Sequence, residues 1–493
     1  MSQAIGSLRK TWFYVISILF VLANAMMLWQ EQYWFLLVPA ALWFVFFITF
    51  SIDKSLLFIT FITPLSILID VEQLGISFTL PTEPLLLGMM LLFYLKLLIE
   101  GRYDTRALYH PISLAIVFYL LWMIFTTISS SMPLTSFKFF LSNLWFITCF
   151  YFIALQLFRK RENLQRWLWL YLLPLTFVIL WSIYNHSTYG FTKQASYWAS
   201  EPFVMNHGIY GAMIAFFFPM IVVYIFKLKV FTKRPLMSFL MLVLLVIFTV
   251  GIILSYTRAA WLGVAAALGF YIWLQLRLRF WTLLTTLGSL AVIFFSFQTQ
   301  ITMALMENKT DSADDLGQHV QSISNVRTDA SNLERLNRWA SGWRMLQERP
   351  WLGWGPGTYM FQYAPFQKPD EKTIISTNAA DVGGIHSEYL NPLVEMGIPG
   401  FVLFMLIIGF SLQRAMSLYY RLQDPYIKNT LLIAMLGLAT YLTHGVLNDY
   451  LDIDKTALLY WSFLAMITAI DVYHNDQAPY PNRPNPGSGD LAP

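Results

Sequence analysis

The sequence predicts an all-α polytopic membrane protein with about fourteen transmembrane helices and one large external loop. Of its 493 residues, 57% are hydrophobic and only 12% are charged, a balance far from that of a soluble domain. Apolar stretches long enough to cross a bilayer recur along most of the chain. They lack the two-residue alternation of a barrel wall, and hydrocarbon tolerates no unpaired backbone groups, so each stretch is predicted to be a helix.

Fourteen apolar segments make up this prediction. They cover about 11–29, 33–51, 55–70, 84–99, 111–130, 137–158, 166–184, 208–226, 236–254, 259–276, 280–298, 389–410, 428–447 and 455–473. The third and fourth are the shortest, and Pro64 is expected to kink the third. Because no small-residue cleavage site follows the first segment, it is expected to be retained as a helix and not removed as a signal peptide.

The distribution of basic residues predicts the orientation. With the amino terminus inside, the short inner connections carry twenty Lys and Arg residues, and the short outer connections carry only Lys138, Lys193, Arg258 and Lys455. This bias follows the positive-inside rule. Both termini are therefore expected on the cytoplasmic side of a plasma membrane, and the long polar stretch 299–388 is expected to lie outside.

The same pattern divides the chain into five parts. They are an N-terminal transmembrane bundle (1–235), three further transmembrane helices (236–298), the external loop (299–388), C-terminal transmembrane helices (389–474) and a tail (475–493). The tail is rich in Pro, Asn and Gly, which predicts disorder.

Several function classes have no support in the composition. Cys149 is the single cysteine, so neither an intramolecular disulfide nor a thiolate metal site is expected. The external histidines lack the spacing of metal ligands, so neither a metal nor another cofactor is expected. Nucleic-acid binding is not expected, because the basic residues of the inner connections face lipid headgroups.

The external loop is predicted to contain an amphipathic helix that begins at Ser331 and ends at Pro350. Ser331 and Glu334 have the spacing of a capping box. An apolar stripe follows at steps of three and four residues, which predicts that the helix lies on the membrane surface or docks on the bundle. The stripe consists of Leu333, Leu336, Ala340, Trp343 and Leu346.

Arg335 and Arg338 share a different face of this helix. A guanidinium group pairs bidentately with phosphate oxygens, so a phosphate is the natural ligand for such a pair. The alternative is that these arginines pair with Glu334, Asp329 or lipid headgroups.

Three further features of the outer side stand out. The segment Gly353–Gly357 is expected to form a tight turn, and it lacks the strand and the Lys-Ser/Thr of a nucleotide-binding loop. His386 lies at the end of the loop, where an imidazole can exchange a proton with a substrate.

Arg258 lies between two spans at the outer boundary, against the charge bias, which marks a functional candidate. Snorkelling to headgroups is the alternative for Arg258, and a structural role is the alternative for His386.

Taken together, these motifs resemble those of the O-antigen ligase and Wzy polymerase superfamily of bacterial cell-envelope enzymes. The resemblance covers about 236 to 410. It is carried by Ser255-Tyr256-Thr257-Arg258, by Arg335 four residues before Trp339, by Arg349-Pro350-Trp351-Leu352-Gly353-Trp354-Gly355-Pro356-Gly357, by His386-Ser387-Glu388-Tyr389-Leu390 and by Glu395-Met396-Gly397-Ile398-Pro399-Gly400. The chain departs from the family at Ala259, where Gly is frequent, and at Ser387, where Asn is frequent.

The resemblance implies a GT-C-type glycosyltransferase of the bacterial inner membrane. The expected reaction transfers a glycan from undecaprenyl pyrophosphate to an acceptor hydroxyl at the outer face, without a metal and with inversion. Arg258 and Arg335 match family arginines that hold the pyrophosphate, and His386 matches the family histidine proposed to activate the acceptor. Arg338 joins the expected pyrophosphate site from its place on the helix and not from the resemblance.

The sequence leaves the acceptor open. Lipid A core would make the protein an O-antigen ligase, a second lipid-linked repeat would make it a polysaccharide polymerase, and a Ser or Thr of a protein would make it an O-oligosaccharyltransferase. The expected partners are the lipid-linked glycan donor, a glycan or lipid acceptor and membrane lipids. A transporter or flippase of lipid-linked glycan or of a small solute is the alternative class, and it predicts ionisable residues deep within the spans.

Overall fold

The structure is a computed structural model of the whole chain. It describes residues 17, 18, 20–24, 26, 27, 51–71, 76–101, 103–227, 235–297, 330–373, 376 and 383–475. The chain divides into two compact units, Met1–Ser55 and Leu56–Pro493. Within the first unit, the described residues between 17 and 27 are helical. The second predicted span, apart from Ser51, and the predicted disordered tail from 476 onward lie outside the described residues.

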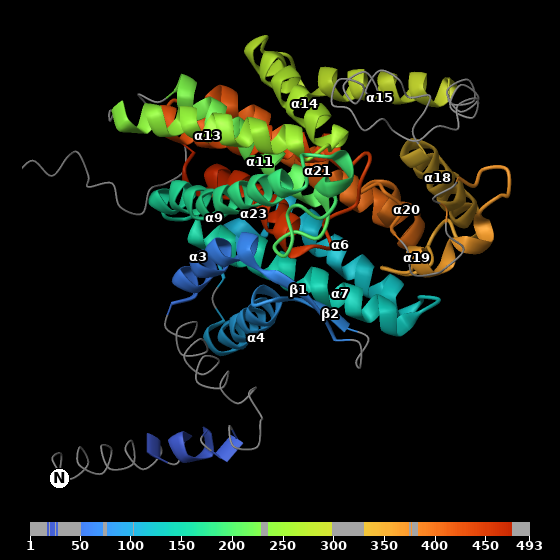
Figure 1. Cartoon of the computed structure of the whole chain (residues 1–493), viewed down its shortest axis with the longest axis horizontal. Coiled ribbons are helices and arrows are strands. Elements are labelled where there is room, and N and C mark those ends of the chain that lie inside the picture. Colours follow the sequence, from blue (N-terminus) through green and yellow to red (C-terminus); the bar gives the residue numbers. More distant parts are fainter. Residues whose placement is uncertain are drawn as a thin grey trace, which may run out of the picture. The chain divides into compact units, whose positions relative to one another are not determined.

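The described part of the larger unit is mainly helical, as predicted (Figure 1). Its elements, counting α3 from its first residue, are α3 (Ile52–Ile62), η2 (Thr63–Leu65), β1 (Ile67–Val71), β2 (Ile76–Leu80), α4 (Thr82–Glu100), α5 (Thr105–Leu108), α6 (Pro111–Ile128), α7 (Pro133–Ile147), η4 (Thr148–Ile153), α8 (Ala154–Leu157), α9 (Arg161–Thr188), α10 (Lys193–Ser196), α11 (His207–Phe226), α13 (Pro235–Leu254), α14 (Arg258–Gln275), α15 (Phe280–Ser296), α18 (Ala330–Glu348), α19 (Tyr359–Gln362), η5 (Ala364–Phe366), α20 (Leu390–Glu395), α21 (Gly397–Arg421), α22 (Pro425–His444) and α23 (Asp454–Tyr473).

Eight helices among the described residues are long and apolar enough to cross a membrane. This confirms a multi-pass helical membrane protein. They are α4, α6, the continuous stretch Pro133–Leu157, α9, α11, α13 from Leu236, α21 and α23. The total of fourteen spans stays a prediction.

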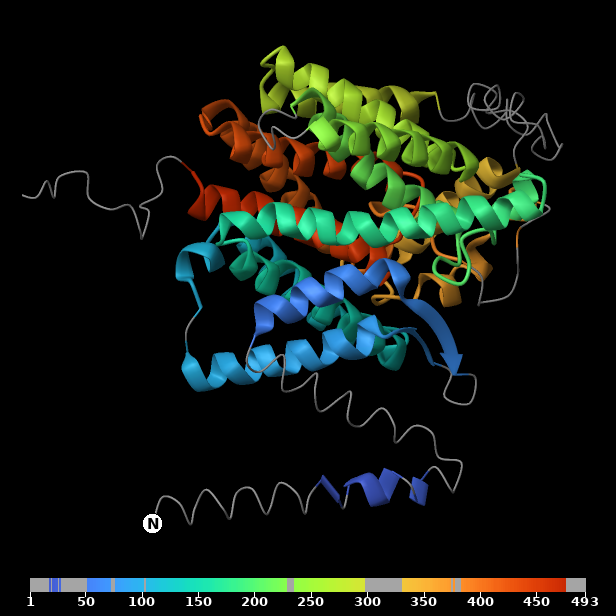
Figure 2. The ribbon, with the colours of Figure 1, turned by 60° about the vertical axis from the view of Figure 1, so that its left-hand side comes forward.

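The third predicted span, 55–70, is wrong in its second half. Helix α3 ends at Ile62, and strands β1 and β2 form an antiparallel hairpin in which Ile67 is opposite Leu80. Figure 2 shows this hairpin extending beyond α3 and α4. Proline at position 64 has no N–H and disfavours the α conformation in the residue before it, which ends the α-helix there.

A buried polar cluster occupies the place where the helix breaks. The Lys455 ammonium donates to the carbonyl oxygens of Thr63 and Ser66, each at 3.0 Å. The Asp454 carboxylate accepts from Thr82 at 2.5 Å and from Ser66 at 3.1 Å. The sequence assigned Lys455 to an outer connection, yet only 4% of it is exposed. These bonds satisfy the backbone groups that the broken helix leaves open.

Helix α23 forms the centre of the larger unit and is buried along nearly its whole length. It packs against α11, α21 and α22 and against the π-helical segment η4. Helix α21 packs on α6, and α14 packs along α22. Figure 1 shows α18, α19 and α20 together at one end of this bundle.

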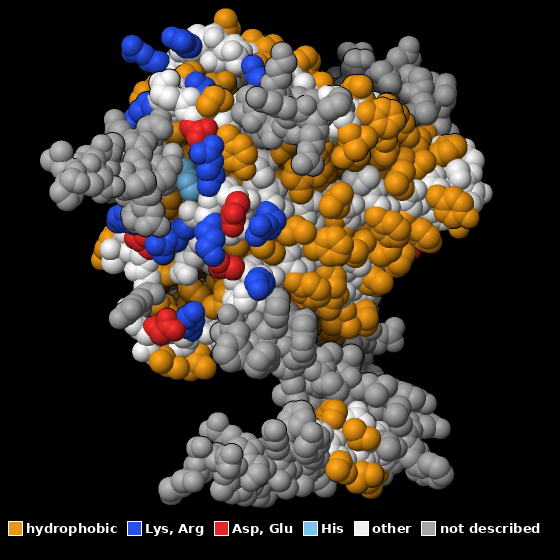
Figure 3. Space-filling model, turned by 90° about the vertical axis from the view of Figure 1, so that its left-hand side faces the viewer, with side chains coloured by type: hydrophobic (Ala, Val, Ile, Leu, Met, Phe, Trp, Pro, Cys, Tyr) orange, Lys and Arg blue, Asp and Glu red, His pale blue; other side chains and the backbone are white. Residues whose placement is uncertain are grey.

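The connections that the sequence places on the inner side meet at one end of the bundle. Arg161 pairs with Asp424 at 2.6 Å, and the guanidinium groups of Arg106 and Arg159 lie over the Tyr473 ring. Figure 3 shows basic and acidic side chains gathered on part of one face, beside a broad apolar surface. Successive spans run in opposite directions, so every second connection lies at the same end of the bundle. The side of the membrane on which this end lies stays a prediction.

Close packing of α14 on α22 depends on Gly263. A Cβ atom at this position would lie 2.7 Å from the carbonyl oxygen of Thr440, whereas one at Gly269 on the same helix would meet nothing within 4 Å. We expect Gly263→Ala to lower the unfolding temperature, because overpacking costs about 1 to 3 kcal/mol. Gly269→Ala is the matched control and should leave that temperature unchanged or raise it. Thermal unfolding in detergent measures both, and equal melting of the two variants would contradict the contact.

Candidate functional site

The turn after α18 docks on the junction between α20 and α21, and a buried carboxylate fixes it there. Glu395 accepts from the backbone N–H groups of Gly357 at 2.7 Å and Tyr359 at 2.9 Å. The Gly355 N–H donates to the Glu395 carbonyl oxygen at 2.8 Å. At Gly353, φ is +66°, and a Cβ atom there would lie 2.4 Å from the backbone of Glu395. The predicted tight turn is confirmed, and its glycines allow this close approach.

The other side of this turn contacts the connection between α6 and α7. The Trp354 carbonyl oxygen accepts from the Ser131 hydroxyl at 2.7 Å and from the Ser131 N–H at 3.0 Å. The sequence assigns both connections to the outer side, and the structure brings them into contact.

Helix α18 buries a face beside the expected one, and the two overlap at Leu346. Its buried residues include Asn337, Arg338, Ser341 and Met345, whereas Trp343 of the predicted apolar stripe is 57% exposed. The polar face can be buried because its groups are paired, for example Asn337 with Gln367 at 2.9 Å. Apolar spacing alone did not predict which face packs inward. The helix also begins at Ala330, one residue before the predicted start.

Arg338 is 3% exposed and has protein partners. It donates to Glu334 at 3.0 Å and to the Gly384 carbonyl oxygen at 2.8 Å, and it lies over the Tyr363 ring. Glu334 also accepts from the hydroxyl groups of Thr373 and Ser376. The pairing with Glu334 is the alternative that the sequence left open for Arg338. These contacts position the 383–386 segment, and a role of Arg338 in binding pyrophosphate stays a prediction.

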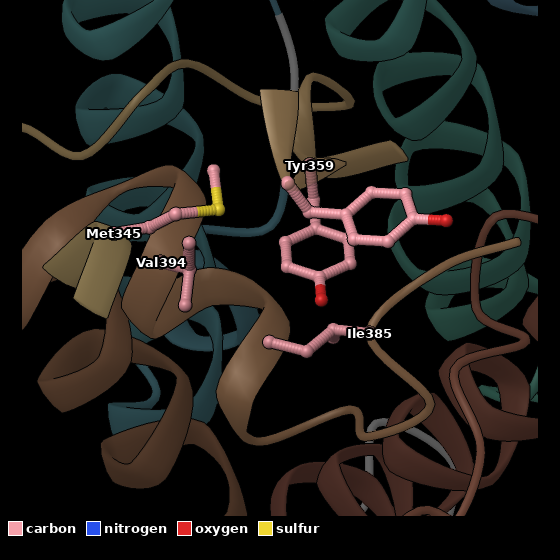
Figure 4. Close-up of a cluster of buried hydrophobic side chains, with 5 residues drawn as sticks. Met345, Tyr359, Ile385 and Val394 are labelled. Atoms are coloured by element: carbon pink, nitrogen blue, oxygen red, sulfur yellow. The ribbon is translucent and has the colours of Figure 1, made fainter. Parts of the chain in front are cut away.

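A small apolar core holds the segment that carries His386. Ile385 is fully buried with Met345, Tyr359 and Val394, and Figure 4 shows these side chains facing one another. A Cβ atom at Gly342 would lie 2.6 Å from the Ile385 side chain, so α18 approaches this segment closely.

His386 follows this anchor in the left-handed region, at φ +57°. Few residues other than glycine adopt that conformation, and its strain is a mark of functional positions. The imidazole is 31% exposed, and its Nδ1 lies 3.9 Å from Oδ1 of Asp449. Burial, Arg335 and Arg338 together lower the pKa of His386 to about 3. The ring is therefore neutral near pH 7.

Arg335 reaches the connection between α22 and α23. Its Nε donates to the Leu447 carbonyl oxygen at 3.0 Å, two residues before Asp449. It acts electrostatically on both His386 and Tyr450. Arg335 and His386 are 51 positions apart in the sequence, and the 445–453 segment brings them together.

Arg258 is the first residue of α14, and the preceding turn holds it in place. Tyr256 has φ +50° and donates its hydroxyl to the Phe191 carbonyl oxygen at 3.0 Å. The Thr257 hydroxyl donates to the carbonyl oxygen of His207 at 2.9 Å. A cation at the start of a helix opposes the helix dipole, so packing and not helix stability accounts for this position.

A chain of contacts leads from Arg258 to the other site residues. A Cβ atom at Gly208, next to His207, would lie 2.2 Å from the Tyr450 hydroxyl. Tyr450 in turn lies within the electrostatic reach of Arg335. The turn that precedes Arg258 therefore contacts the start of α11, which lies against Tyr450, and Arg335 reaches the same 445–453 segment from α18.

Two carboxylates complete the site, and sequence analysis did not single them out. Oε1 of Glu388 accepts from the Tyr441 hydroxyl at 2.5 Å and from the N–H groups of Tyr450 and Leu451, which fixes the 445–453 segment. Asp449 accepts from the backbone N–H of His386, and burial raises the pKa of Asp449 to about 7. The segment Asn448-Asp449-Tyr450 follows a predicted span as an isolated polar triplet, which is the one signal that could have drawn attention to it.

The arrangement combines an anion-binding side with a proton acceptor. Arg258 and Arg335 supply guanidinium groups that can neutralise developing negative charge. His386 supplies a neutral imidazole beside a carboxylate that can stabilise its protonated form. Among the described residues, no group of three or more His, Cys, Asp or Glu could hold a metal ion.

Comparison with known families gives one match. Residues 243–405 match the family model described as O-antigen ligase. The match runs from α13 into α21 and includes Arg258, Arg335 and His386. A comparison with curated proteins found no match. The family match covers about a third of the chain, and within that segment the chain is similar to the O-antigen ligase family.

Proposed function

We propose that the protein is a GT-C-type glycosyltransferase that transfers a glycan from undecaprenyl pyrophosphate to an acceptor hydroxyl at the outer face of the bacterial inner membrane. Arg335 and His386 approach the same short segment between α22 and α23, and this observation carries the proposal. The family match supports the class of reaction. The polyprenyl chain would remain among the spans, with the glycan outside.

The donor half of the reaction falls to the arginines. The bond between the anomeric carbon and the pyrophosphate oxygen breaks, and its electron pair leaves with undecaprenyl pyrophosphate. Guanidinium groups that are already in place stabilise this charge without reorganisation, which is the largest electrostatic contribution available to such a site. The proposed ligands are Arg258 and Arg335, with Arg338 holding the loop that carries His386.

In the acceptor half of the reaction, His386 is the general base. Its imidazole takes the proton of the acceptor hydroxyl as the oxygen forms the new bond to the anomeric carbon. Attack opposite the leaving group inverts the configuration, because a single displacement needs no protein nucleophile. Asp449 lies 3.9 Å from Nδ1 and can stabilise the imidazolium that forms. General-base assistance of this kind is worth roughly 10²- to 10⁴-fold.

A reconstituted reaction tests the proposal. The full-length protein in nanodiscs is given an undecaprenyl-pyrophosphate-linked glycan and an acceptor, with or without EDTA. We expect a glycan–acceptor product of inverted anomeric configuration and release of undecaprenyl pyrophosphate, both unaffected by EDTA. A product ladder from the lipid-linked repeat alone would identify a polymerase, and dependence on added lipid A core would identify a ligase. Translocation of the intact lipid-linked glycan without bond cleavage would contradict the proposal.

A further inference from the structure

A pocket rich in carboxylates lies directly beside His386. Its lining includes Glu388, Glu395, Asp449 and Asp452, together with Trp461. Asp449 belongs both to this pocket and to the surroundings of His386, which is 3.9 Å away. The pocket is small, so it suits one or two polar groups of a larger ligand and not a whole sugar ring.

Two polar atoms in the pocket have no hydrogen-bond partner among the described residues. Glu388 is 7% exposed, and all three hydrogen bonds that its carboxylate accepts go to Oε1, which leaves Oε2 without a donor among the described residues. Trp461 is 1% exposed, and its Nε1–H likewise has no acceptor there. Burial of a polar group without a hydrogen-bond partner is unfavourable, and the Trp461 indole N–H is such a group. Both groups therefore point to a ligand that both donates and accepts hydrogen bonds.

Charge separates this pocket from the arginines. Tyr450 directs its hydroxyl toward Gly208 at the start of α11, next to His207, which the Arg258 turn contacts, while its N–H donates to Glu388 at the pocket. The 445–453 segment thus lies between a basic side and an acidic side. Phosphate is favoured on the first side and repelled on the second.

We propose that this acidic pocket is the acceptor subsite, and that it selects an acceptor whose terminal sugar presents hydroxyl or ammonium groups over one that presents phosphate or carboxylate. The inference depends on the proposed function and adds the substrate class for its second half. Hydroxyl groups of a sugar can donate to the free oxygen of Glu388 and accept from the indole of Trp461. An ammonium group gains in addition from the neighbouring carboxylates. A phosphate at the same place meets like charge, which is a device for rejecting a wrong substrate.

Binding can be measured without turnover. Saturation-transfer NMR with the full-length protein in nanodiscs compares three probes, namely octyl glucoside, octyl glucosaminide and octyl glucoside 6-phosphate. We expect the glucosaminide to bind at least tenfold more tightly than the 6-phosphate, with the neutral glucoside between them. In the transfer assay, the same order is expected in kcat/KM.

Asp452→Lys tests the role of the pocket, because Asp452 is exposed and its replacement leaves the buried bonds of Glu388 intact. We expect Asp452→Lys to reduce the preference for the glucosaminide over the 6-phosphate at least tenfold. Asp452→Asn should reduce the same preference by a smaller factor. Asp370→Lys makes the same charge change at an exposed position outside the pocket and should keep the wild-type preference.

The outcomes separate the two proposals. Equal binding of the three probes, or an unchanged preference in Asp452→Lys, would overturn the acceptor subsite even if glycan transfer occurs. Loss of preference in Asp370→Lys as well would assign the effect to overall charge and would also overturn it. Selective binding without release of undecaprenyl pyrophosphate from the donor would instead overturn the proposed transfer reaction and leave the pocket as a sugar-binding site.

Discussion

His386→Asn should reduce the rate of glycan transfer about 10²- to 10⁴-fold while leaving the fold intact. The imidazole is the proton acceptor in the proposed reaction, and an amide cannot replace it. Asparagine is chosen because the position has φ +57°, and asparagine tolerates the left-handed region better than most residues. The initial rate of product formation at saturating donor and acceptor measures the effect.

His386→Ala serves as the comparison for this variant. Alanine removes the same ring but adds the strain of positive φ, about 1 to 2 kcal/mol. We therefore expect equal loss of activity in the two variants and a lower unfolding temperature for alanine alone. If His386→Asn retained activity within tenfold of wild type, a role as general base would be excluded.

Much of the fold followed from the sequence because the bilayer imposes simple rules. Helices α6, α9, α11 and α23 cover the predicted spans closely, since long apolar runs have one stable form in hydrocarbon. The break after Ile62 was missed, because its stability depends on distant side chains. Lys455 and Asp454 bind the open backbone and hydroxyl groups there, and no local pattern near residue 62 shows that they are adjacent.

The site was only partly predictable for the same reason. Motif resemblance pointed to Arg258, Arg335 and His386, of which the last two lie in the external loop and the first at the outer boundary of an earlier span. It did not show that Arg338 pairs with Glu334 at 3.0 Å. That pairing follows from the burial of the polar face of α18, which depends on residues as distant as Gly384.

Asp449 illustrates a further limit. A lone acidic residue after an apolar span is common and carries little information by itself. Its position beside His386 depends on Glu388, which holds the 445–453 segment through three hydrogen bonds. The structure therefore adds to the motifs two buried carboxylates, Glu388 and Asp449, which hold the 445–453 segment beside His386.

Arg335→Lys should reduce kcat/KM for the lipid-linked donor about 10- to 150-fold, although the charge is kept. A charged hydrogen bond contributes about 1.5 to 3 kcal/mol, and lysine offers a point charge in place of the planar donor fork that can bind two phosphate oxygens. Lysine also lacks the Nε–H that fixes Arg335 to the Leu447 carbonyl oxygen at 3.0 Å. Arg258→Lys should have an effect of similar size.

The matched control for this experiment is Arg344→Lys. Arg344 lies on the same helix and binds Glu371 and the Phe366 carbonyl oxygen, away from His386. Its replacement should lower the unfolding temperature and leave KM for the donor unchanged, whereas Arg335→Lys should raise that KM and keep KM for the acceptor. Because a general loss of stability would alter both variants alike, only a selective effect on the donor supports a pyrophosphate ligand. Wild-type donor kinetics in both Arg335→Lys and Arg335→Ala would remove Arg335 from the site.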